Sequence, residues 1–186
     1  MALRIAYGTV IENARGGTGD DNLRGNEIGN LLFGNDGNDL LRGGGDNDIL
    51  RGGTGNDTYA WHLGDGRDIV REEGNGGIDV ATFTDASGSI DSLEDDFTIR
   101  RFGDDLRIDL TLNQNEGQGT VIISDFGQAG SSVELMRING LVGAEVVQIG
   151  GDFDLTSIFA SATSTSQRFR VTDSIGANGG FIAVPV

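Results

Sequence analysis

A nine-residue repeat in the first half of the chain constrains the fold more than any other feature. From residue 16 the sequence reads GGTGDDNLR, GNEIGNLLF, GNDGNDLLR, GGGDNDILR and GGTGNDTYA, five units in succession without an insertion. Two looser units follow at 63–71 and 74–82, each preceded by a two-residue insertion, Trp61 with His62 and Glu72 with Glu73. A short period repeated this often is typical of a solenoid, in which each unit packs on its neighbours.

Two positions of the repeat carry its chemistry, because the sixth is an acid or an amide and the eighth is apolar or aromatic. The sixth-position residues are Asp21, Asn30, Asp39, Asp48, Asp57, Asp68 and Asp79. The eighth-position residues are Leu23, Leu32, Leu41, Leu50, Tyr59, Val70 and Ala81. Positions 1, 2 and 4 are mostly Gly, which suits a turn with positive φ. Each unit therefore predicts a six-residue turn and a three-residue strand with one inward side chain, and two units complete one coil of 18 residues.

Stacking of the coils predicts two columns of sixth-position residues. Asp21, Asp39 and Asp57 lie in one column with Asp79 as a fourth member, and Asn30, Asp48 and Asp68 form the other. Carboxylates one strand spacing apart, ~4.8 Å, repel unless a cation lies between them. Carboxylate and carbonyl oxygens are the ligands that calcium prefers. An acidic, Gly-rich disordered linker fits the composition but does not explain this register.

Composition excludes several other kinds of protein. The absence of Cys excludes disulfides, a thiol nucleophile and Cys-ligated zinc, and the single His, His62, excludes an HExxH zinc site. Thirteen Arg against 29 acidic residues give a net charge of −16, which argues against binding to nucleic acid or anionic lipid. No apolar run approaches the ~18 residues of a membrane span. An enzyme would need a triad around His62 or a carboxylate pair, and we expect a non-catalytic chain.

The units GGTGDDNLR (16–24) and GGTGNDTYA (52–60) resemble the GGxGxDxUx nonapeptide of RTX, or haemolysin-type, calcium-binding proteins. Residues 6–14 resemble the lead-in to the β-roll in the C-terminal region of serralysin-type secreted metallopeptidases. Residues 58–83 resemble the region that follows the roll in haemolysin-type proteins. The resemblance implies an all-β fold, a parallel β-roll of calcium-binding nonapeptide repeats followed by an antiparallel β capping region.

The resemblance also implies where calcium binds, because in this family the ion lies between turns two repeats apart. Sixth-position Asp side chains and turn carbonyls hold it. The implied ion-bridged pairs, with about three to five ions in all, are Asp21 and Asp39, Asp39 and Asp57, Asp48 and Asp68, and Asp57 and Asp79. The implied turn ligands at positions 2 and 4 are Gly17, Gly19, Asn35, Gly37, Gly44, Asp46, Gly53 and Gly55. Asn30 in place of Asp predicts a weaker Asn30–Asp48 site, and Asp46 in place of Gly either adds a ligand or strains its turn.

Three regions are predicted along the chain. Residues 1–83 form the roll with its lead-in, 84–140 an antiparallel β cap packed on the roll, and 141–186 a C-terminal segment. Within the cap, the alternation of 97–112 predicts a hairpin, 113–119 a loop, and 120–126 and 132–138 two further strands. The tail 175–186 is similar in placement to the uncleaved type I secretion signal of RTX proteins.

The resemblance implies a non-catalytic calcium-binding module of a type I-secreted, extracellular protein from a Gram-negative bacterium. Such a module folds on calcium binding after export and supports an attached domain, with the type I secretion machinery as its partner. Two alternatives stay open, namely the C-terminal fragment of a secreted metalloprotease and an alginate-like polysaccharide-binding module of a carbohydrate-modifying enzyme. The arginines that would bind the anionic polysaccharide are Arg15, Arg24, Arg42 and Arg51. Leu31, Phe33 and Ile49 are expected on the outer face of one sheet, either covered by the downstream half or an upstream domain or serving as a surface for a ligand or partner.

Overall fold

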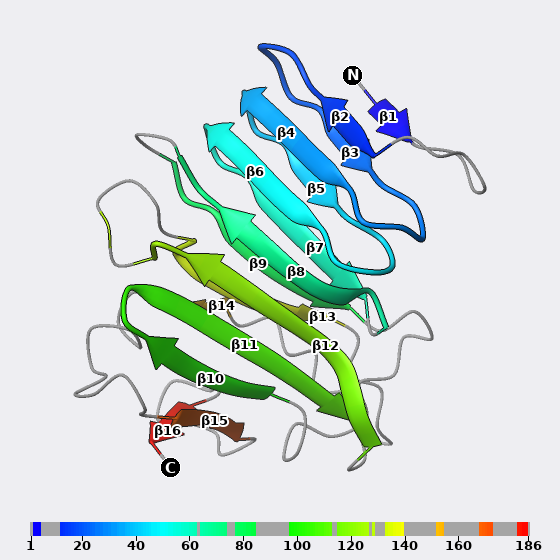
Figure 1. The fold of residues 1–186 in the computed structure, drawn as a ribbon. Coiled ribbons are helices and arrows are strands. Elements are labelled where there is room, and N and C mark those ends of the chain that lie inside the picture. The colour runs from blue at the N-terminus through cyan, green and yellow to red at the C-terminus, as the bar shows by residue number, and fades with distance from the viewer. Residues whose placement is uncertain are drawn as a thin grey trace.

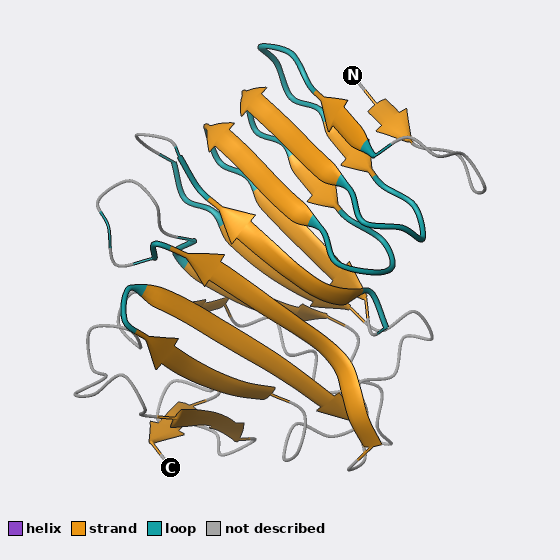
Figure 2. Ribbon diagram, in the orientation of Figure 1, coloured by secondary structure: helices purple, strands orange, loops and turns teal. Residues whose placement is uncertain are grey.

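The computed structural model describes residues 2–4, 12–62, 64–73, 77–84, 97–112, 115–126, 128, 133–139, 152–154, 168–172 and 182–185. In these ranges the regular elements are strands joined by turns and loops, and no helix is drawn (Figure 2). Accordingly, none of these residues belongs to a helix long and apolar enough to cross a membrane. The all-β class predicted from the sequence is confirmed.

The strands form two sheets that face each other (Figure 1). Sheet A has the order β1 (Ala2–Arg4), β3 (Asn22–Arg24), β5 (Leu40–Arg42), β7 (Thr58–His62), β9 (Val80–Thr84), β13 (Leu135–Asn139) and β14 (Asp152–Asp154). Sheet B has the order β16 (Ile182–Pro185), β15 (Arg168–Thr172), β10 (Phe97–Phe102), β11 (Asp105–Leu112), β12 (Asn115–Ser124), β8 (Gly66–Arg71), β6 (Ile49–Thr54), β4 (Leu31–Asp36) and β2 (Asn13–Arg15).

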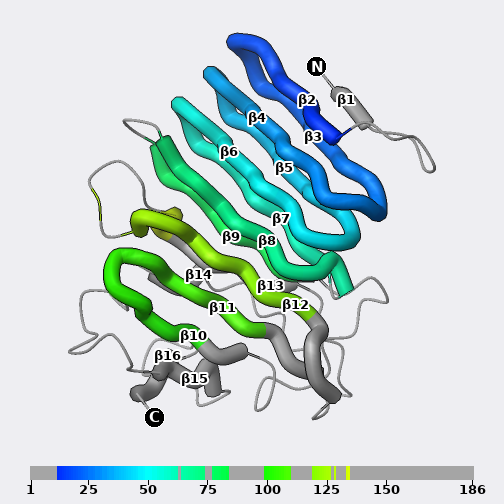
Figure 3. Tube along the Cα trace, in the orientation of Figure 1, coloured from blue at the N-terminus to red at the C-terminus, as the bar shows by residue number. Residues whose placement is uncertain are grey.

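From β2 to β9 the chain crosses from one sheet to the other at each successive strand (Figure 3). Parallel pairing therefore joins strands two units apart, so that Leu23 lies opposite Leu41 in sheet A and Leu32 lies opposite Leu50 in sheet B. This is the 18-residue coil that the repeat predicts. The parallel β-roll is confirmed.

The eighth-position side chains fill the space between the sheets, as predicted. Each of the seven is at most 1% exposed. Apart from Thr82, which is buried, their neighbours in the strands are half-buried or exposed, because successive side chains of a strand point to opposite faces. Where the insertions widen the coil, stacked rings extend the core, with centroid distances of 6.2 Å from Tyr59 to Trp61 and 5.3 Å from Trp61 to Phe83.

Neighbouring leucines in β5 allow a direct test of this core. Leu41 is fully buried, whereas Leu40 beside it is half-buried on the outer face. We expect Leu41→Ala to lower the free energy of unfolding in saturating calcium by about 2–5 kcal/mol, because it leaves a cavity. Leu40→Ala should cost less than half as much. Urea denaturation followed by circular dichroism measures both, and equal losses would contradict the inward assignment of Leu41.

The region after the roll combines antiparallel and parallel pairing. The hairpin predicted over 97–112 is confirmed, since β10 and β11 pair antiparallel with Phe102 opposite Asp105. β12 then pairs antiparallel with β11 but parallel with β8, and β13 pairs parallel with β9. These two strands thus continue the sheets of the roll, and they cover backbone edges that would otherwise be open to pairing with another chain.

The predicted loop at 113–119 is wrong for its described part, because β12 begins at Asn115. Gly119 lies opposite both Leu110 of β11 and Gly66 of β8. Pairing with β11 reaches Asn115, and pairing with β8 begins at Gly119, so contacts with other strands override the weak strand propensity of this polar, Gly-rich stretch. The strand predicted at 132–138 is β13, and of the tail 175–186 the structure describes 182–185, which is β16. Residues 6–11 of the lead-in and residues 175–181 and 186 of the tail lie outside the described residues.

Candidate metal centre

The sixth-position residues form two columns joined by hydrogen bonds from backbone to side chain. In column one, the N–H groups of Asp21, Asp39 and Asp57 donate to Oδ1 of Asp39, Asp57 and Asp79 at 2.8, 2.8 and 2.7 Å. In column two, the N–H groups of Asn30 and Asp48 donate to Oδ1 of Asp48 and Asp68 at 2.7 and 2.9 Å. The structure thus brings together the pairs that the sequence places two units apart.

In Asp21, Asp39, Asp48 and Asp57 the second carboxylate oxygen, Oδ2, points into the turn of its own unit. A Cβ atom added at Gly34 would lie 2.1 Å from Oδ2 of Asp39 and 2.5 Å from the carbonyl oxygen of Gly52. One carboxylate oxygen and one carbonyl oxygen from the adjacent coil therefore converge where Gly leaves space. Gly16 has the same arrangement, with Oδ2 of Asp21 at 2.5 Å and the carbonyl oxygen of Gly34 at 2.6 Å.

Positive φ at positions 2 and 4 shapes the turns of the third, fourth and fifth units. The φ values are 80° and 123° for Asn35 and Gly37, 112° and 70° for Gly44 and Asp46, and 114° and 129° for Gly53 and Gly55. Asp46 is exposed and holds a φ that a non-Gly residue adopts at some cost. Gly17 and Gly19 of the first unit do not adopt positive φ. The turn ligands implied by the family resemblance thus lie in two kinds of turn, one with positive φ at positions 2 and 4 and one without it.

Burial raises the pKa of five column carboxyl groups, those of Asp39, Asp48, Asp57, Asp68 and Asp79. Desolvation is the largest cause in each case, and neighbouring carboxylates add to it. The pKa rises to about 7 for Asp48, about 6 for Asp57, and about 8 for Asp68 and Asp79. The pKa of Asp39 is also raised by desolvation. Ionised, these groups require a counter-charge within the turns.

Orphaned oxygen atoms show that the columns fit a cation. Oδ2 of Asp39, Asp48 and Asp57 is buried and has no hydrogen-bond partner. A buried carboxylate oxygen without a donor is costly unless it binds a proton or a metal ion. Oδ2 of Asp39 converges with the carbonyl oxygen of Gly52 in the space beside Gly34, and an all-oxygen ligand set of this kind suits calcium.

Three residues outside the sixth position of the repeat also lie at the centre. Glu72, from an insertion, is 4% exposed, and Asp57, Glu72 and Asp79 offer ligand atoms that all lie within 4.8 Å of one another. Glu134, before β13, accepts a hydrogen bond from the N–H of Asp79 at 2.8 Å and so occupies the next place in column one. The indole N–H of Trp61 donates to Oδ2 of Asp68. The sequence ELMR at 134–137 repeats the acid-x-apolar-Arg pattern of the units and could have revealed Glu134.

Replacing Asp39 with Asn should have opposite effects with and without calcium. The amide keeps Oδ1 as the acceptor for the N–H of Asp21, but it replaces the orphaned Oδ2 with an N–H₂ donor. We expect Asp39→Asn to bind calcium at least ~10-fold more weakly and to unfold less readily than the wild type in chelator. Calorimetric titration and urea denaturation measure the two effects. Asp36→Asn, at an exposed carboxylate, is the control, and equal changes in both variants would contradict the assignment.

Comparison with known families agrees with this geometry. Residues 8–27 and 24–59 match the RTX calcium-binding nonapeptide repeat, in four copies. No curated protein shows a significant match to the chain. The matched module is itself non-catalytic and binds calcium, and its family indicates a secreted, extracellular protein associated with type I secretion. The resemblance to serralysin-type metallopeptidases stays an expectation.

Proposed function

We propose that this RTX calcium-binding nonapeptide-repeat module is a folding switch that passes through a type I secretion system unfolded and folds on extracellular calcium. The observation that carries the proposal is the pair of buried carboxylate columns with orphaned Oδ2 atoms. Residues Asp21, Asp39, Asp48, Asp57 and Asp68, with the turn carbonyls, are the proposed ligands, and Asp79 extends column one.

The mechanism follows from charge and mass action. At low intracellular calcium, the columns would have to bury several like charges, so the unfolded chain is favoured. Outside the cell, each ion that binds only the folded state stabilises it by RT ln(1 + [Ca]/Kd), about 2.7 kcal/mol at a calcium concentration 100-fold above Kd. Several such sites suffice to convert an unfolded chain into a folded one, because small domains are stable by only about 5–15 kcal/mol.

The rest of the chain has a supporting role in this proposal. We assign 1–83 to the roll, 84–140 to a cap and 141–186 to a C-terminal segment with the secretion signal. Pairing of β12 on β8 and of β13 on β9 supports a cap that folds together with the last coils. A cap that closes the roll in this way would transmit calcium-dependent folding to an attached domain, such as an upstream catalytic domain.

Limited proteolysis with trypsin tests the proposal, because the chain has thirteen Arg and no Lys, and several of these Arg lie in the roll strands. We expect Arg24, Arg42 and Arg51 to be protected in millimolar calcium and cleaved rapidly in chelator. Magnesium at the same concentration should not protect them. Equal cleavage with calcium and with chelator would overturn the folding switch.

One observation favours a second function, the binding of an anionic polysaccharide such as alginate. On the outer face of sheet B, the guanidinium carbons of Arg15 and Arg51 lie 4.8 and 5.4 Å from the ring centroid of Phe33. They line a cleft of about 190 Å³ with Asn35 and Glu73. Phe33 is thereby half-buried, which accounts for part of the apolar face expected from the sequence.

Electrophoresis in an alginate-containing gel with calcium present tests this second function. Arg24 and Arg42 lie in sheet A, and Arg42 pairs with Asp65 at 3.0 Å, so the sheet B pair is the better candidate. We expect Arg15→Gln to reduce the retardation of the protein and Arg24→Gln to leave it unchanged. Wild-type protein that migrates alike with and without alginate would exclude this function.

A further inference from the structure

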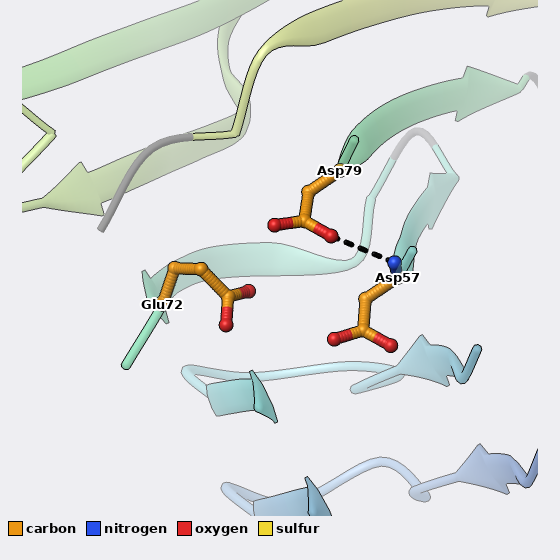
Figure 4. A group of neighbouring side chains, drawn as sticks. All are labelled: Asp57, Glu72 and Asp79. Atoms are coloured by element: carbon orange, nitrogen blue, oxygen red, sulfur yellow. Dashed lines mark hydrogen bonds between the residues drawn. The ribbon is translucent and has the colours of Figure 1, made fainter. Parts of the chain in front are cut away.

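A cluster of three carboxyl groups lies where the roll meets the strands that follow it. Asp57 and Asp79 belong to column one, whereas Glu72 comes from the insertion between the last two units. All three are buried, and the close-up shows their carboxyl groups turned toward a common space (Figure 4). The ligand atoms that they offer lie within 4.8 Å of one another.

An orphaned oxygen points into this cluster. Asp57 is 0% exposed, and its Oδ2 has no hydrogen-bond partner. A Cβ atom added at Gly52 would lie 2.2 Å from this oxygen and 2.4 Å from the hydroxyl oxygen of Tyr59. The same hydroxyl donates to Oε2 of Glu72. The unpartnered oxygen of Asp57 and the carboxylate of Glu72 therefore face the same small space.

Glu72 is held in place by the backbone around it. Its Oε1 accepts hydrogen bonds from the N–H of Gly53 at 3.0 Å and from the N–H of Glu73 at 3.2 Å. The hydroxyl of Tyr59, itself an acceptor for the N–H of Gly52 at 2.8 Å, contacts Oε2. This side chain is thus fixed before any ligand arrives, which reduces the cost of ordering it on binding.

We propose that Asp57, Glu72 and Asp79 form a three-carboxylate calcium site that the nonapeptide pattern alone does not supply. The proposal deepens the proposed function and rests on it, since Asp57 and Asp79 are also column members. Two oxygens on opposite sides of a calcium ion, each at about 2.4 Å from it, lie about 4.8 Å apart, so ligand atoms within 4.8 Å of one another are close enough to share one ion. Magnesium requires shorter metal–oxygen distances, about 2.1 Å, and gives up its bound water reluctantly, so this site favours calcium.

The position of this site joins the roll to the strands after it. The N–H of Asp79 donates to Oε2 of Glu134, and the next residue along the chain begins β13, which pairs with β9. An ion bound by Asp79 therefore fixes the strand on which β13 is built. Loss of this ion should loosen β9 and β13 while leaving the first coils in place.

Counting bound calcium by native mass spectrometry, alongside calorimetric titration, tests the site with two matched variants. Glu72→Gln keeps the size and the hydrogen-bond acceptor of the side chain but removes its charge. Glu73→Gln makes the same change at the exposed neighbouring residue, which pairs with Arg51. We expect Glu72→Gln to bind one ion fewer than the wild type and to lose hydrogen-exchange protection in β9 and β13. Glu73→Gln should bind as many ions as the wild type.

The outcomes separate this inference from the proposed function. A wild type that binds several ions, with an unchanged count in Glu72→Gln, overturns the three-carboxylate site and leaves the folding switch intact. A wild type that binds no calcium overturns both. If the circular dichroism spectrum shows that Glu72→Gln does not fold like the wild type, the ion count of the variant is not used. Anomalous diffraction from wild-type crystals grown with terbium then decides whether an ion lies beside Glu72. A peak at coordination distance from Glu72 supports the site, and occupied nonapeptide sites without such a peak overturn it.

Discussion

Calcium-free protein should gain folded structure when the pH is lowered from about 8 to about 5. Burial raises the pKa of Asp48, Asp68 and Asp79 to between about 7 and 8, against about 3.9 in an unfolded chain. The folded state therefore binds more protons than the unfolded state between these values. Its stability is fully present below about pH 3.9 and is lost as the pH rises through about 7 to 8. At pH 5, protons thus replace calcium in neutralising the columns.

Far-UV circular dichroism in chelator, recorded across this pH range, measures the effect. In saturating calcium the dependence should reverse, because protons compete with calcium for the same oxygens. Asp48→Asn imitates the protonated carboxyl group, so it should reduce the pH dependence of the calcium-free protein, whereas the exposed Asp36→Asn should not. Calcium-free protein that is equally unfolded at pH 8 and pH 5 would contradict the burial of the columns.

Gly43→Ala should prevent the roll from folding normally even in saturating calcium. Gly43 is buried, and an added Cβ would lie 1.9 Å from Oδ2 and 2.6 Å from Cβ of Asp48. The methyl group would thus occupy the space into which the orphaned oxygen points, and it would collide with the side chain that carries it. We expect a loss of about 3 kcal/mol or more, at the upper end for overpacked cores, together with the loss of the ion between Asp48 and Asp68.

Gly19→Ala is the matched control, because no atom lies within 4 Å of a Cβ added there. It should change the free energy of unfolding by less than about 1 kcal/mol. Urea denaturation in calcium compares the two variants. Similar stability for Gly43→Ala and Gly19→Ala would mean that the turns are looser than the structure describes.

The roll could be predicted from the sequence because its determinants repeat in register. Each unit places an acid, or in one case the amide Asn30, two residues before an apolar or aromatic side chain, so a single period fixes the buried column, the core and the pairing of strands. The structure confirms this in the burial of Leu23 and Leu50 and in the hydrogen bond from Asp39 to Asp57. Local pattern and tertiary packing agree here.

The strands after the roll and the acidic residues outside the repeat depend on contacts between distant segments. The nine-residue pattern does not contain these contacts. β12 begins with the polar sequence NEGQG, which pairs with β11 at Asn115 and Gly119 and with β8 at Gly119, and its own propensity does not predict a strand. Glu72 lies outside the nine-residue register, and its role becomes visible when the coil brings it beside Asp57 and Asp79. Glu134 has a recognisable pattern, but one copy 55 residues after Asp79 does not define a repeat.

Titration of calcium into chelator-treated protein at neutral pH tests the central claim most directly. Far-UV circular dichroism follows the β-structure, and the fluorescence of Trp61, the single Trp of the chain, follows column two, because its indole N–H donates to Asp68. We predict a cooperative gain of β-structure together with a change in Trp61 emission between high micromolar and millimolar calcium, absent with magnesium. A chelated protein that already has the full β-structure, with Trp61 emission indifferent to calcium, would contradict the account.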